Sequence, residues 1–433
     1  MNIKDLKLDT KIIEALVDLG FIDATPIQEK CIPLILEGKD VFGQSSTGSG
    51  KTAAFGLPMI QNIKQGHGIQ ALILTPTREL CVQVTNSLRD FSKYQRLNII
   101  SVYGGVSIDN QIRVIRSADI VVATPGRVLD HLKRNTIKFD KVRYLVLDEA
   151  DKMFEMGFID DVEIIISQVP KQRQTLLFSA TVPNTVNHII KKHMIDPISI
   201  KSSTHVDRSL LKQTYYQVKE FEKFSLVVSL LKKHPDGLSL VFCGTRRLTD
   251  VVARNLQAQG IHSMAIHGGL TQNRRAYALE ALKKQDINVL VATDVAARGL
   301  DIKNVSHVYN YNVPKTSDEY IHRIGRTARA GSSGDAITLL SEKDYDNFNR
   351  VLYDRSISIT KVVVPNFEKV NMIRFEQRPH RSFNNRDGHS QNRSWHNRDS
   401  NDHSRNRNSN EGNNENKTWG NAYSKNRNSP RRR

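Results

Sequence analysis

Residues 40–52 read DVFGQSSTGSGKT, and this segment is the strongest indication of the fold. An apolar run from Asp40 to Gly43 precedes a loop of glycine, serine and threonine, and a helical pattern over Ala53 to Ile63 follows it. Small residues let successive backbone N–H groups curl around a phosphate, while Lys51 can reach the phosphate oxygens and Thr52 can ligate Mg²⁺. The stretch therefore predicts a phosphate-binding loop between a strand and a helix.

An acidic cluster follows a second apolar strand, from Tyr144 to Leu147. Its sequence is Asp148-Glu149-Ala150-Asp151, and a carboxylate at a strand tip beside a phosphate loop can hold Mg²⁺. Asp148 fits that role, and Glu149 fits the role of orienting and deprotonating an attacking water. A solvated acidic turn is the alternative for this cluster alone, but both motifs together favour hydrolysis of a nucleoside triphosphate.

Short β-branched runs alternate with amphipathic stretches along most of the chain, which predicts an α/β fold of parallel sheets covered by helices. Short motifs such as SSTGSGKT and DEAD follow these runs. Ligands of open α/β sheets bind at the carboxyl ends of strands, so we expect one edge of each domain to be functional. A polar segment from Lys201 to Lys212 predicts a linker, and therefore two tandem domains at 1–205 and 206–366. The predicted strands are Asp40–Gly43, Gln70–Thr75, Ile99–Tyr103, Asp119–Ala123, Tyr144–Leu147, Thr175–Phe178, Ser239–Cys243, His262–Ile266, Asn288–Ala292, His307–Tyr311 and Ala336–Leu340.

Composition narrows the class of protein. The 433 residues have a formal net charge of +18, which favours a polyanion partner, nucleic acid first, over a merely solvated basic surface. No apolar run approaches the roughly 18 residues that a membrane span needs, and no secretory signal is visible, so we expect a soluble cytoplasmic protein without a membrane partner. Its three cysteines, Cys31, Cys81 and Cys243, lack metal-site spacing, and we expect buried thiols.

The final segment, assigned to residues 367–433, differs from the rest. From Glu376 onward it holds 13 Lys and Arg against six Asp and Glu, together with 14 Asn and few hydrophobic residues. Such a composition cannot bury enough apolar area to offset its ordering entropy, so it predicts disorder. Arginine, asparagine and sparse aromatics suit sequence-tolerant contact with RNA, and a solubilising tail is the alternative.

A cationic cluster in the second half reads HRIGRTAR from His322 to Arg329. It predicts a helix on which Arg326 and Arg329 share one face. Guanidinium groups delivered across a cleft would stabilise charge on the transferring phosphoryl group. A basic helix face paired with surface acids is the alternative.

With these clusters in one order, the chain resembles a DEAD-box ATP-dependent RNA helicase of superfamily 2 from about residue 3 to residue 365. The resemblance rests on Gly20-Phe21 with Thr25-Pro26-Ile27-Gln28, SSTGSGKT, Pro76-Thr77-Arg78-Glu79-Leu80, Gly104-Gly105, Thr124-Pro125-Gly126-Arg127, DEAD, Ser179-Ala180-Thr181, Val241-Phe242-Cys243, Gln272 with Arg275, Ala292-Thr293-Asp294 through Arg298-Gly299-Leu300-Asp301, and HRIGRTAR. It implies two RecA-like domains that hydrolyse ATP with Mg²⁺ and locally unwind short RNA duplexes without long-range translocation.

The resemblance also implies a role for each matching residue. Gln28 would read the adenine edge, Asp301 would contact the ribose, and Arg326 and Arg329 would be the γ-phosphate fingers. The catalytic residues would be Lys51, Glu149, Arg326 and Arg329; the nucleotide-binding residues Phe21, Thr25, Gln28, Ser46, Thr47, Gly48, Ser49, Gly50, Lys51, Thr52, Gly299 and Asp301; and the metal ligands Thr52 and Asp148.

A second group of matching residues would serve RNA and its coupling to hydrolysis. Their types suit phosphate and sugar contacts, which position a strand without reading its sequence. The RNA-binding residues would be Pro76, Thr77, Arg78, Gly105, Thr124, Gly126, Arg127, Thr245, Gln272, Arg275 and Thr293, and the coupling residues Ser179, Ala180, Thr181 and His322, with hydrogen bonds between the coupling segment and DEAD.

The chain departs from the family pattern at a few positions. Ile3 stands where an aromatic is usual, Ser45 where alanine is common, and Arg274 where an acid is common. Ala328 replaces the usual glycine between the fingers, and as the better helix former we expect it to be tolerated.

Three functions remain open on the sequence alone. The first is an RNA-dependent ATPase that unwinds duplexes and remodels RNA or ribonucleoprotein. The second is an ATP-gated RNA clamp or annealing factor, and the third is a motor directed to DNA. The first function is compatible with partners in ribonucleoproteins or in RNA decay, and the sequence implies no oligomer.

Overall fold

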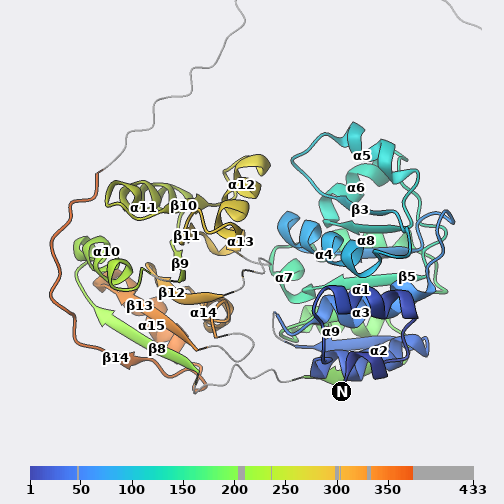
Figure 1. Ribbon diagram of the computed structural model, residues 1–433, viewed down its shortest axis with the longest axis horizontal. Coiled ribbons are helices and arrows are strands. Elements are labelled where there is room, and N and C mark those ends of the chain that lie inside the picture. Colours follow the sequence, from blue (N-terminus) through green and yellow to red (C-terminus); the bar gives the residue numbers. More distant parts are fainter. Residues whose placement is uncertain are drawn as a thin grey trace, which may run out of the picture. The chain divides into compact units, whose positions relative to one another are not determined.

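Two parallel β-sheets with helices on both faces form the computed structural model (Figure 1). It describes residues 1–45, 48–202, 210–235, 237–297, 302, 304–328 and 333–373. Each sheet of these residues has seven strands, and every pairing within the sheets is parallel. The predicted α/β fold with mainly parallel sheets is therefore confirmed.

The first sheet has the strand order β3-β4-β2-β5-β6-β1-β7. Its central strands are apolar without alternation, as in Ala71–Leu74 where all four residues are buried, because both faces of a parallel sheet are covered. The strands are β1 (Val41–Gln44), β2 (Ala71–Leu74), β3 (Ile99–Val102), β4 (Ile120–Ala123), β5 (Tyr144–Asp148), β6 (Gln174–Ser179) and β7 (Ile198–Lys201).

Two hydrophobic cores lie on the two faces of this sheet. One face is covered by α1 (Thr10–Asp18), α2 (Pro26–Leu36), α3 (Lys51–Asn62) and α4 (Arg78–Phe91), preceded by the 3-10 helix η1 (Ile3–Asp5). The other is covered by α5 (Ile108–Ile115), α6 (Pro125–Lys133), α7 (Ala150–Glu155), α8 (Ile159–Ser167) and α9 (Asn184–His193). Alternating strands and helices thus bury both faces, and only the loops at the strand ends remain available for ligands.

The second sheet repeats the same plan, with the order β10-β11-β9-β12-β13-β8-β14. Its strands are β8 (Leu211–Gln217), β9 (Leu238–Phe242), β10 (Ser263–Ile266), β11 (Val289–Ala292), β12 (Val305–Asn310), β13 (Gly334–Leu340) and β14 (Thr360–Lys361). One face packs on α10 (Lys223–Lys233) and α11 (Arg246–Ala258). The other packs on α12 (Gln272–Lys283), α13 (Asp294–Ala297), α14 (Ser317–Ile324) and α15 (Tyr345–Leu352), and two 3-10 helices, η2 (Glu220–Glu222) and η3 (Glu342–Asp344), complete the domain.

Eleven predicted strands have counterparts within a few residues, and three observed strands were missed. The missed strands are β7, β8 and β14, which lie at or beside the β7 and β14 edges of the two sheets. Their apolar content is low, since β7 reads ISIK with no fully buried residue and β8 reads LKQTYYQ. The predicted linker shrinks accordingly, because β7 ends at Lys201 and β8 begins at Leu211; the residues 203–209 lie outside the described part.

The chain remains packed beyond residue 366, where the sequence analysis placed the domain end. Phe367, Val370 and Met372 pack against the core of the second sheet. The Val370 N–H donates to the hydroxyl of Ser225 at 3.0 Å. The predicted tail otherwise lies outside the described residues, and the domain boundaries stay predictions.

The three cysteines are buried free thiols, as expected. Burial raises the pKa of Cys31 and of Cys81 to about 12, so both are protonated at neutral pH. Among the described residues, none of the helices combines the length and hydropathy required to span a bilayer.

Candidate nucleotide and nucleic-acid sites

The strand order sorts the predicted site residues into two groups in the first domain. The loops that follow β3, β4 and β2, which are neighbours in the sheet, carry the predicted RNA contacts. The ends of β5, β6 and β1, also neighbours, and the segments that follow them carry the predicted phosphate-binding, metal and coupling residues, whereas Phe21, Thr25 and Gln28 precede β1. Carboxyl ends of parallel strands share one edge, so each group is assembled from segments far apart in sequence.

The phosphate-binding loop is tied to the start of α2. Thr25 and Gln28 form a capping box at the N-terminus of α2, with the Thr25 N–H donating to Gln28 Oε1 at 2.9 Å. The same side chains reach the loop: Thr25 Oγ1 donates to the Ser49 carbonyl at 2.8 Å, and Gln28 Nε2 donates to the Gly50 carbonyl at 3.1 Å. The predicted adenine reader therefore also supports the phosphate loop.

Gly50 must be glycine for two reasons. Its φ is +92°, a region that favours glycine, and a Cβ there would fall 2.4 Å from Gln28 Nε2. The next residue, Lys51, begins α3, is buried, and donates from Nζ to the Ser45 carbonyl at 3.0 Å. The first turn of α3 thus opens directly onto the loop. Ser46 and Thr47 lie outside the described residues, and Phe21 packs edge-on against Phe91.

Two adjacent carboxylates lie at the end of β5 beside Lys51. Burial raises the pKa of Asp148 to about 7, and the charge of Lys51 opposes this rise. Asp148 Oδ1 is buried and has no hydrogen-bond partner among the described residues. A buried carboxylate oxygen without a partner suits a divalent cation, which prefers oxygen ligands, so these residues fit the expected Mg²⁺.

Glu149 lies in a different electrostatic environment from its neighbour. Burial disfavours its charged form, but the nearby charges of Lys152, Lys51 and Arg326 outweigh burial and lower the pKa of Glu149 to about 2. Its φ of +52° is unusual for a residue with a side chain, and such strain collects at functional sites. The carboxylate is thus held ionised, as a proton acceptor must be.

The predicted hydrogen bonds between the coupling segment and the DEAD segment are present. One oxygen of Asp151 accepts from the Ala180 N–H at 3.1 Å, the Thr181 N–H at 2.9 Å and Thr181 Oγ1 at 3.0 Å. The Asp151 N–H in turn donates to Ser179 Oγ at 3.3 Å. A shift of either segment would therefore move the other. The role of this link in strand separation stays a prediction.

The predicted RNA contacts of the first domain lie close to one another. The guanidinium of Arg78 lies against the Gly104-Gly105 backbone, where a Cβ on Gly105 would meet Arg78 Nη1 at 2.0 Å. Thr77 caps α4 through Oγ1, which accepts from the Leu80 N–H at 3.3 Å. Thr124 precedes Pro125 at the start of α6, Gly126 is exposed, and Pro76 is buried beside Thr77.

Arg127 is held by a network that the sequence analysis did not predict. Its Nη1 donates to Gln111 Oε1 at 3.0 Å and to the Val106 carbonyl at 3.1 Å. His131 is fully buried, and its Nε2 lies 3.1 Å from Gln111 Oε1. Burial lowers the pKa of His131, which keeps the ring neutral and compatible with this network at neutral pH. The orientation of Arg127 therefore depends on α5 and on its own helix, α6.

Predicted RNA contacts of the second domain follow β9, β10 and β11, again neighbours in the sheet. Thr245 caps α11 and Thr293 precedes α13. Arg275 is mostly buried, and its Nη2 lies 2.6 Å from Glu79 Oε2, while Gln272 Nε2 donates to Glu79 Oε1 at 3.3 Å. In this structure both predicted RNA contacts therefore bind the acid of the PTREL segment.

The arginine cluster departs from the predicted helix. Helix α14 ends at Ile324, so Arg326 lies beyond it and the prediction of one continuous helix through Arg329 is wrong. Arg323 makes a bidentate pair with Asp294 and donates to the Asn312 carbonyl at 2.6 Å, which fixes the end of α14. His322 is half-buried in α14, whereas Gly299, Asp301 and Arg329 lie outside the described residues.

Ala328 was expected to be tolerated because alanine is a better helix former than glycine, and this reason is also wrong. The φ of Ala328 is +53°, so the residue is not helical and helix propensity does not apply. A left-handed conformation costs an L-residue roughly 1 kcal/mol, which glycine avoids.

We expect Ala328→Gly to raise the free energy of unfolding by up to about 0.5 kcal/mol, because relief of backbone strain slightly exceeds the loss of one methyl group and the greater entropy of the unfolded chain. Urea unfolding of the two proteins would measure the difference. A less stable variant would show that the buried methyl group matters more than the backbone.

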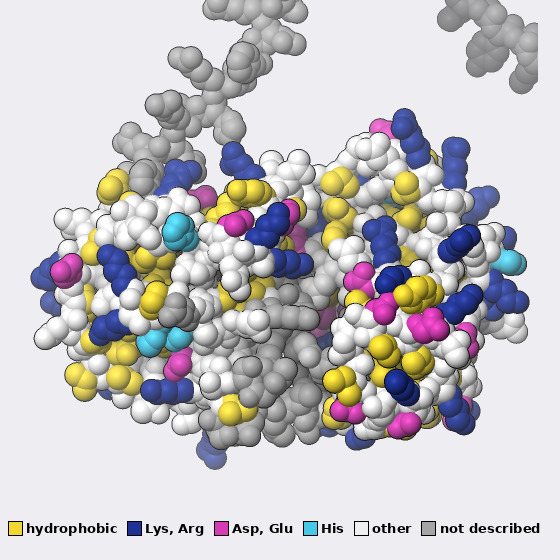
Figure 2. All heavy atoms as spheres, viewed as in Figure 1, with side chains coloured by type: hydrophobic (Ala, Val, Ile, Leu, Met, Phe, Trp, Pro, Cys, Tyr) yellow, Lys and Arg dark blue, Asp and Glu magenta, His cyan; other side chains and the backbone are white. Residues whose placement is uncertain are grey.

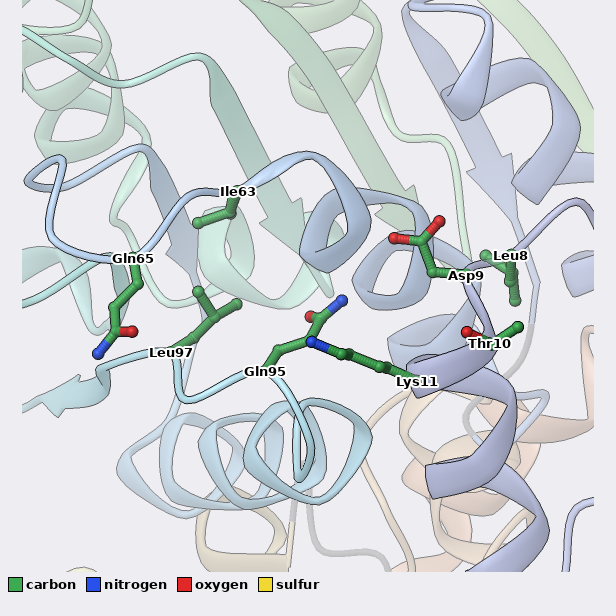
Figure 3. A pocket seen from close by; sticks show the side chains of 8 residues that line it. All are labelled: Leu8, Asp9, Thr10, Lys11, Ile63, Gln65, Gln95 and Leu97. Carbon is green, nitrogen blue, oxygen red and sulfur yellow. The ribbon is translucent and has the colours of Figure 1, made fainter.

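A surface pocket lies apart from all of these residues (Figure 3). It opens between the start of α1 and the chain before β3, and it contains none of the predicted site residues. Its lining is Leu8, Asp9, Thr10, Lys11, Ile63, Gln65, Gln95 and Leu97. Both charges in it, Asp9 and Lys11, are exposed and opposite in sign, so it selects no class of ligand.

Lys152, Gln111 and Arg323 have roles in the structure that the sequence did not predict. Lys152 follows Glu149 by three residues, a spacing that places two side chains on one side of a helical turn, and this signal was available. The partners of Gln111 and Arg323 come from distant segments, so no local pattern marks them.

Comparisons with known proteins match both domains. The model of the DEAD/DEAH box helicase family matches residues 25–189, and that of the helicase conserved C-terminal domain matches residues 222–331. The ATP-dependent RNA helicase CshA of Listeria monocytogenes is 50% identical over 340 residues, which are 78% of this chain and 65% of that protein. The chain therefore spans less than two thirds of the length of that relative.

Two solved structures extend the comparison. A DEAD box protein from Methanococcus jannaschii is 40% identical, with 84% of this chain and 99% of that chain covered and a TM-score of 0.52. S. cerevisiae Dbp5 bound to RNA and ADP BeF3 is 31% identical, with 84% and 96% covered and a TM-score of 0.76.

Proposed function

The chain belongs to the DEAD-box family of RNA helicases, and from this premise we propose that it is an ATP-dependent RNA helicase whose ATP hydrolysis is stimulated by RNA. One observation carries the proposal: Asp148, Glu149 and Lys51 share a buried site at the end of β5 and the start of α3. Buried groups of opposite charge are costly to assemble, and such clusters are typical of active sites.

Each residue has a role in the proposed reaction. Glu149 accepts a proton from the water that attacks the γ-phosphorus, while the bond to the bridging oxygen breaks and leaves ADP. Lys51 and Arg326 bring positive charge to the phosphate oxygens. Thr52 and Asp148 would hold Mg²⁺, which supplies further positive charge to the phosphates when bound.

The RNA side follows from the other group of loops. Arg78, Arg127 and the exposed Gly105 and Gly126 offer cations and backbone to a phosphate chain, which favours binding without sequence preference. On the face in Figure 2, Lys and Arg side chains are interspersed with acidic and apolar ones and form no single stripe. We propose that the local geometry of these loops directs single strands and short duplexes to the domains.

Steady-state ATP turnover tests the proposal when measured without nucleic acid, with single-stranded RNA, and with DNA of the same sequence. We expect strong stimulation by RNA alone. Equal stimulation by DNA would favour a DNA motor, and equal turnover under all three conditions would refute coupling. Unwinding of a short duplex, compared with annealing of its strands at matched ATP turnover, would separate a helicase from an RNA clamp.

We further propose that the segment after Glu376 adds RNA affinity, given its basic composition. Deletion of residues 377–433 should weaken RNA binding and flatten its dependence on salt, because a protein that neutralises fewer phosphates releases fewer counterions on binding. Both tryptophans, Trp395 and Trp419, lie in this segment, so their fluorescence should change on RNA titration of the full chain. An unchanged salt slope and constant emission would leave only a solubilising role.

Location and partners complete the proposal. A cytoplasmic location and partners in ribonucleoproteins fit an RNA helicase of this family. Partners in ribonucleoproteins would require that the protein binds RNA.

A further inference from the structure

Lys152 is the least exposed cation beside the proposed catalytic base. Its side chain is 1% exposed, that of Glu149 is 7% exposed, and Lys152 Nζ lies 2.9 Å from Glu149 Oε2. The two residues occupy the first turn of α7, with Glu149 at its N-cap. A lysine is almost never buried to this degree unless an anion neutralises it.

The partners of these atoms are few. Apart from the ion pair, neither Lys152 Nζ nor Glu149 Oε2 has a hydrogen-bond partner in the part of the chain that the structure describes. The other nearby acid, Asp151, uses its carboxylate for Lys152 N–H, Ala180 and Thr181. The one ion pair of the Lys152 ammonium in this part of the chain is therefore with Glu149, while its charge reaches Asp148 only through space.

We propose that Lys152 is a positioning residue for ATP hydrolysis, which holds Glu149 by Oε2 and leaves Oε1 to accept the proton of the attacking water. This inference rests on the proposed role of Glu149 as the base. A carboxylate with one oxygen anchored presents the other in a fixed direction, and misplacement by 1 Å can cost a hundredfold in rate. The anchor also offsets the burial of the negative charge.

A second buried lysine separates this role from a structural one. Lys223 is fully buried in the second domain and pairs with Asp344 and with Glu220, whose Oε2 lies 3.1 Å away. These partners belong to η2 and η3, and none of them is a predicted site residue. Lys223 therefore has the burial and the ion pairing of Lys152 but no link to the base.

The test compares Lys152→Met, Lys152→Arg and the control Lys223→Met at saturating RNA. We expect Lys152→Met to lower kcat about tenfold or more, with the KM for ATP within about twofold of the parent value. Lys152→Arg, which keeps the cation, should recover most of kcat. Lys223→Met should lower the Tm and leave kcat per folded molecule unchanged.

The outcomes are distinguishable even where a variant folds poorly. Should Lys152→Met fail to fold, Lys152→Gln replaces it, because the glutamine amide can still donate to Glu149 Oε2. We expect the kcat of Lys152→Gln to lie below that of Lys152→Arg and above one-tenth of the parent value. A parental kcat in folded Lys152→Met or Lys152→Gln would overturn the inference, as would an equal loss in Lys223→Met. Turnover that survives Glu149→Gln would instead refute the assignment of the base, whatever Lys152 does.

Discussion

Glu149→Gln should reduce RNA-stimulated ATP turnover by a factor of about 10² to 10⁴, the range that general-base catalysis supplies. The amide has nearly the same shape as the carboxylate but does not accept a proton at neutral pH. Asp148 and Lys51 are untouched, so binding of ATP and of RNA should persist. Single-turnover hydrolysis and equilibrium binding of a non-hydrolysable analogue would measure the two quantities separately.

A matched control is available on the same domain. Glu163 of α8 is a partly exposed acid paired with Lys192, and Glu163→Gln removes the same charge away from the site. Its turnover should equal that of the parent protein. Normal turnover in Glu149→Gln would show that another group takes the proton, whereas loss of ATP binding would show a structural role for the carboxylate.

Arg326→Gln should lower kcat by about 10³ or more, because a finger arginine neutralises charge that develops only in the transition state. Arg326 is 3% exposed. Burial raises the pKa of Glu149, and the charge of Arg326 lowers it, though less than the charges of Lys152 and Lys51 do. The KM for ATP should change little, since the interaction is stronger in the transition state than in the ground state. Steady-state kinetics at saturating RNA would separate kcat from KM.

An arginine of the same domain serves as the control. Arg350 is exposed on α15, and Arg350→Gln should leave kcat unchanged. An Arg326→Gln protein with parental kcat and a raised KM would assign this arginine to ground-state binding. An equal loss in both variants would indicate a general effect of charge.

Local chemistry explains why much of the site was predictable. Glycine at Gly50, Lys51 at the start of α3, and Asp148 at the end of β5 follow from backbone rules and phosphate chemistry that act within a few residues. Buried parallel strands such as β2 can also be recognised from the sequence, because the side chains on both faces of the sheet are buried and therefore apolar. The strands β7 and β14 did not, since an edge strand buries little.

Other features depended on partners from distant segments. Ala328 was judged by helix propensity, yet the chain leaves α14 at Ile324 and turns with a positive φ. The network of Arg127 depends on Gln111 from a different helix, and Arg323 depends on Asp294 at the start of α13. Neither contact has a local pattern, because hydrogen bonds at a sheet edge join residues by strand order rather than by spacing.

The sequence by itself determined the α/β class, the phosphate loop, the acidic strand tip and the family, because each rests on short-range geometry repeated along the chain. Which loops meet depends on the strand order of the folded sheet: β5 lies between β2 and β6, so the DEAD segment lies where the nucleotide and RNA groups of loops adjoin. Only the tertiary structure decided that Lys152 is buried against Glu149. Burial removes water from that ion pair, and desolvation is a property of the packed chain that no residue carries alone.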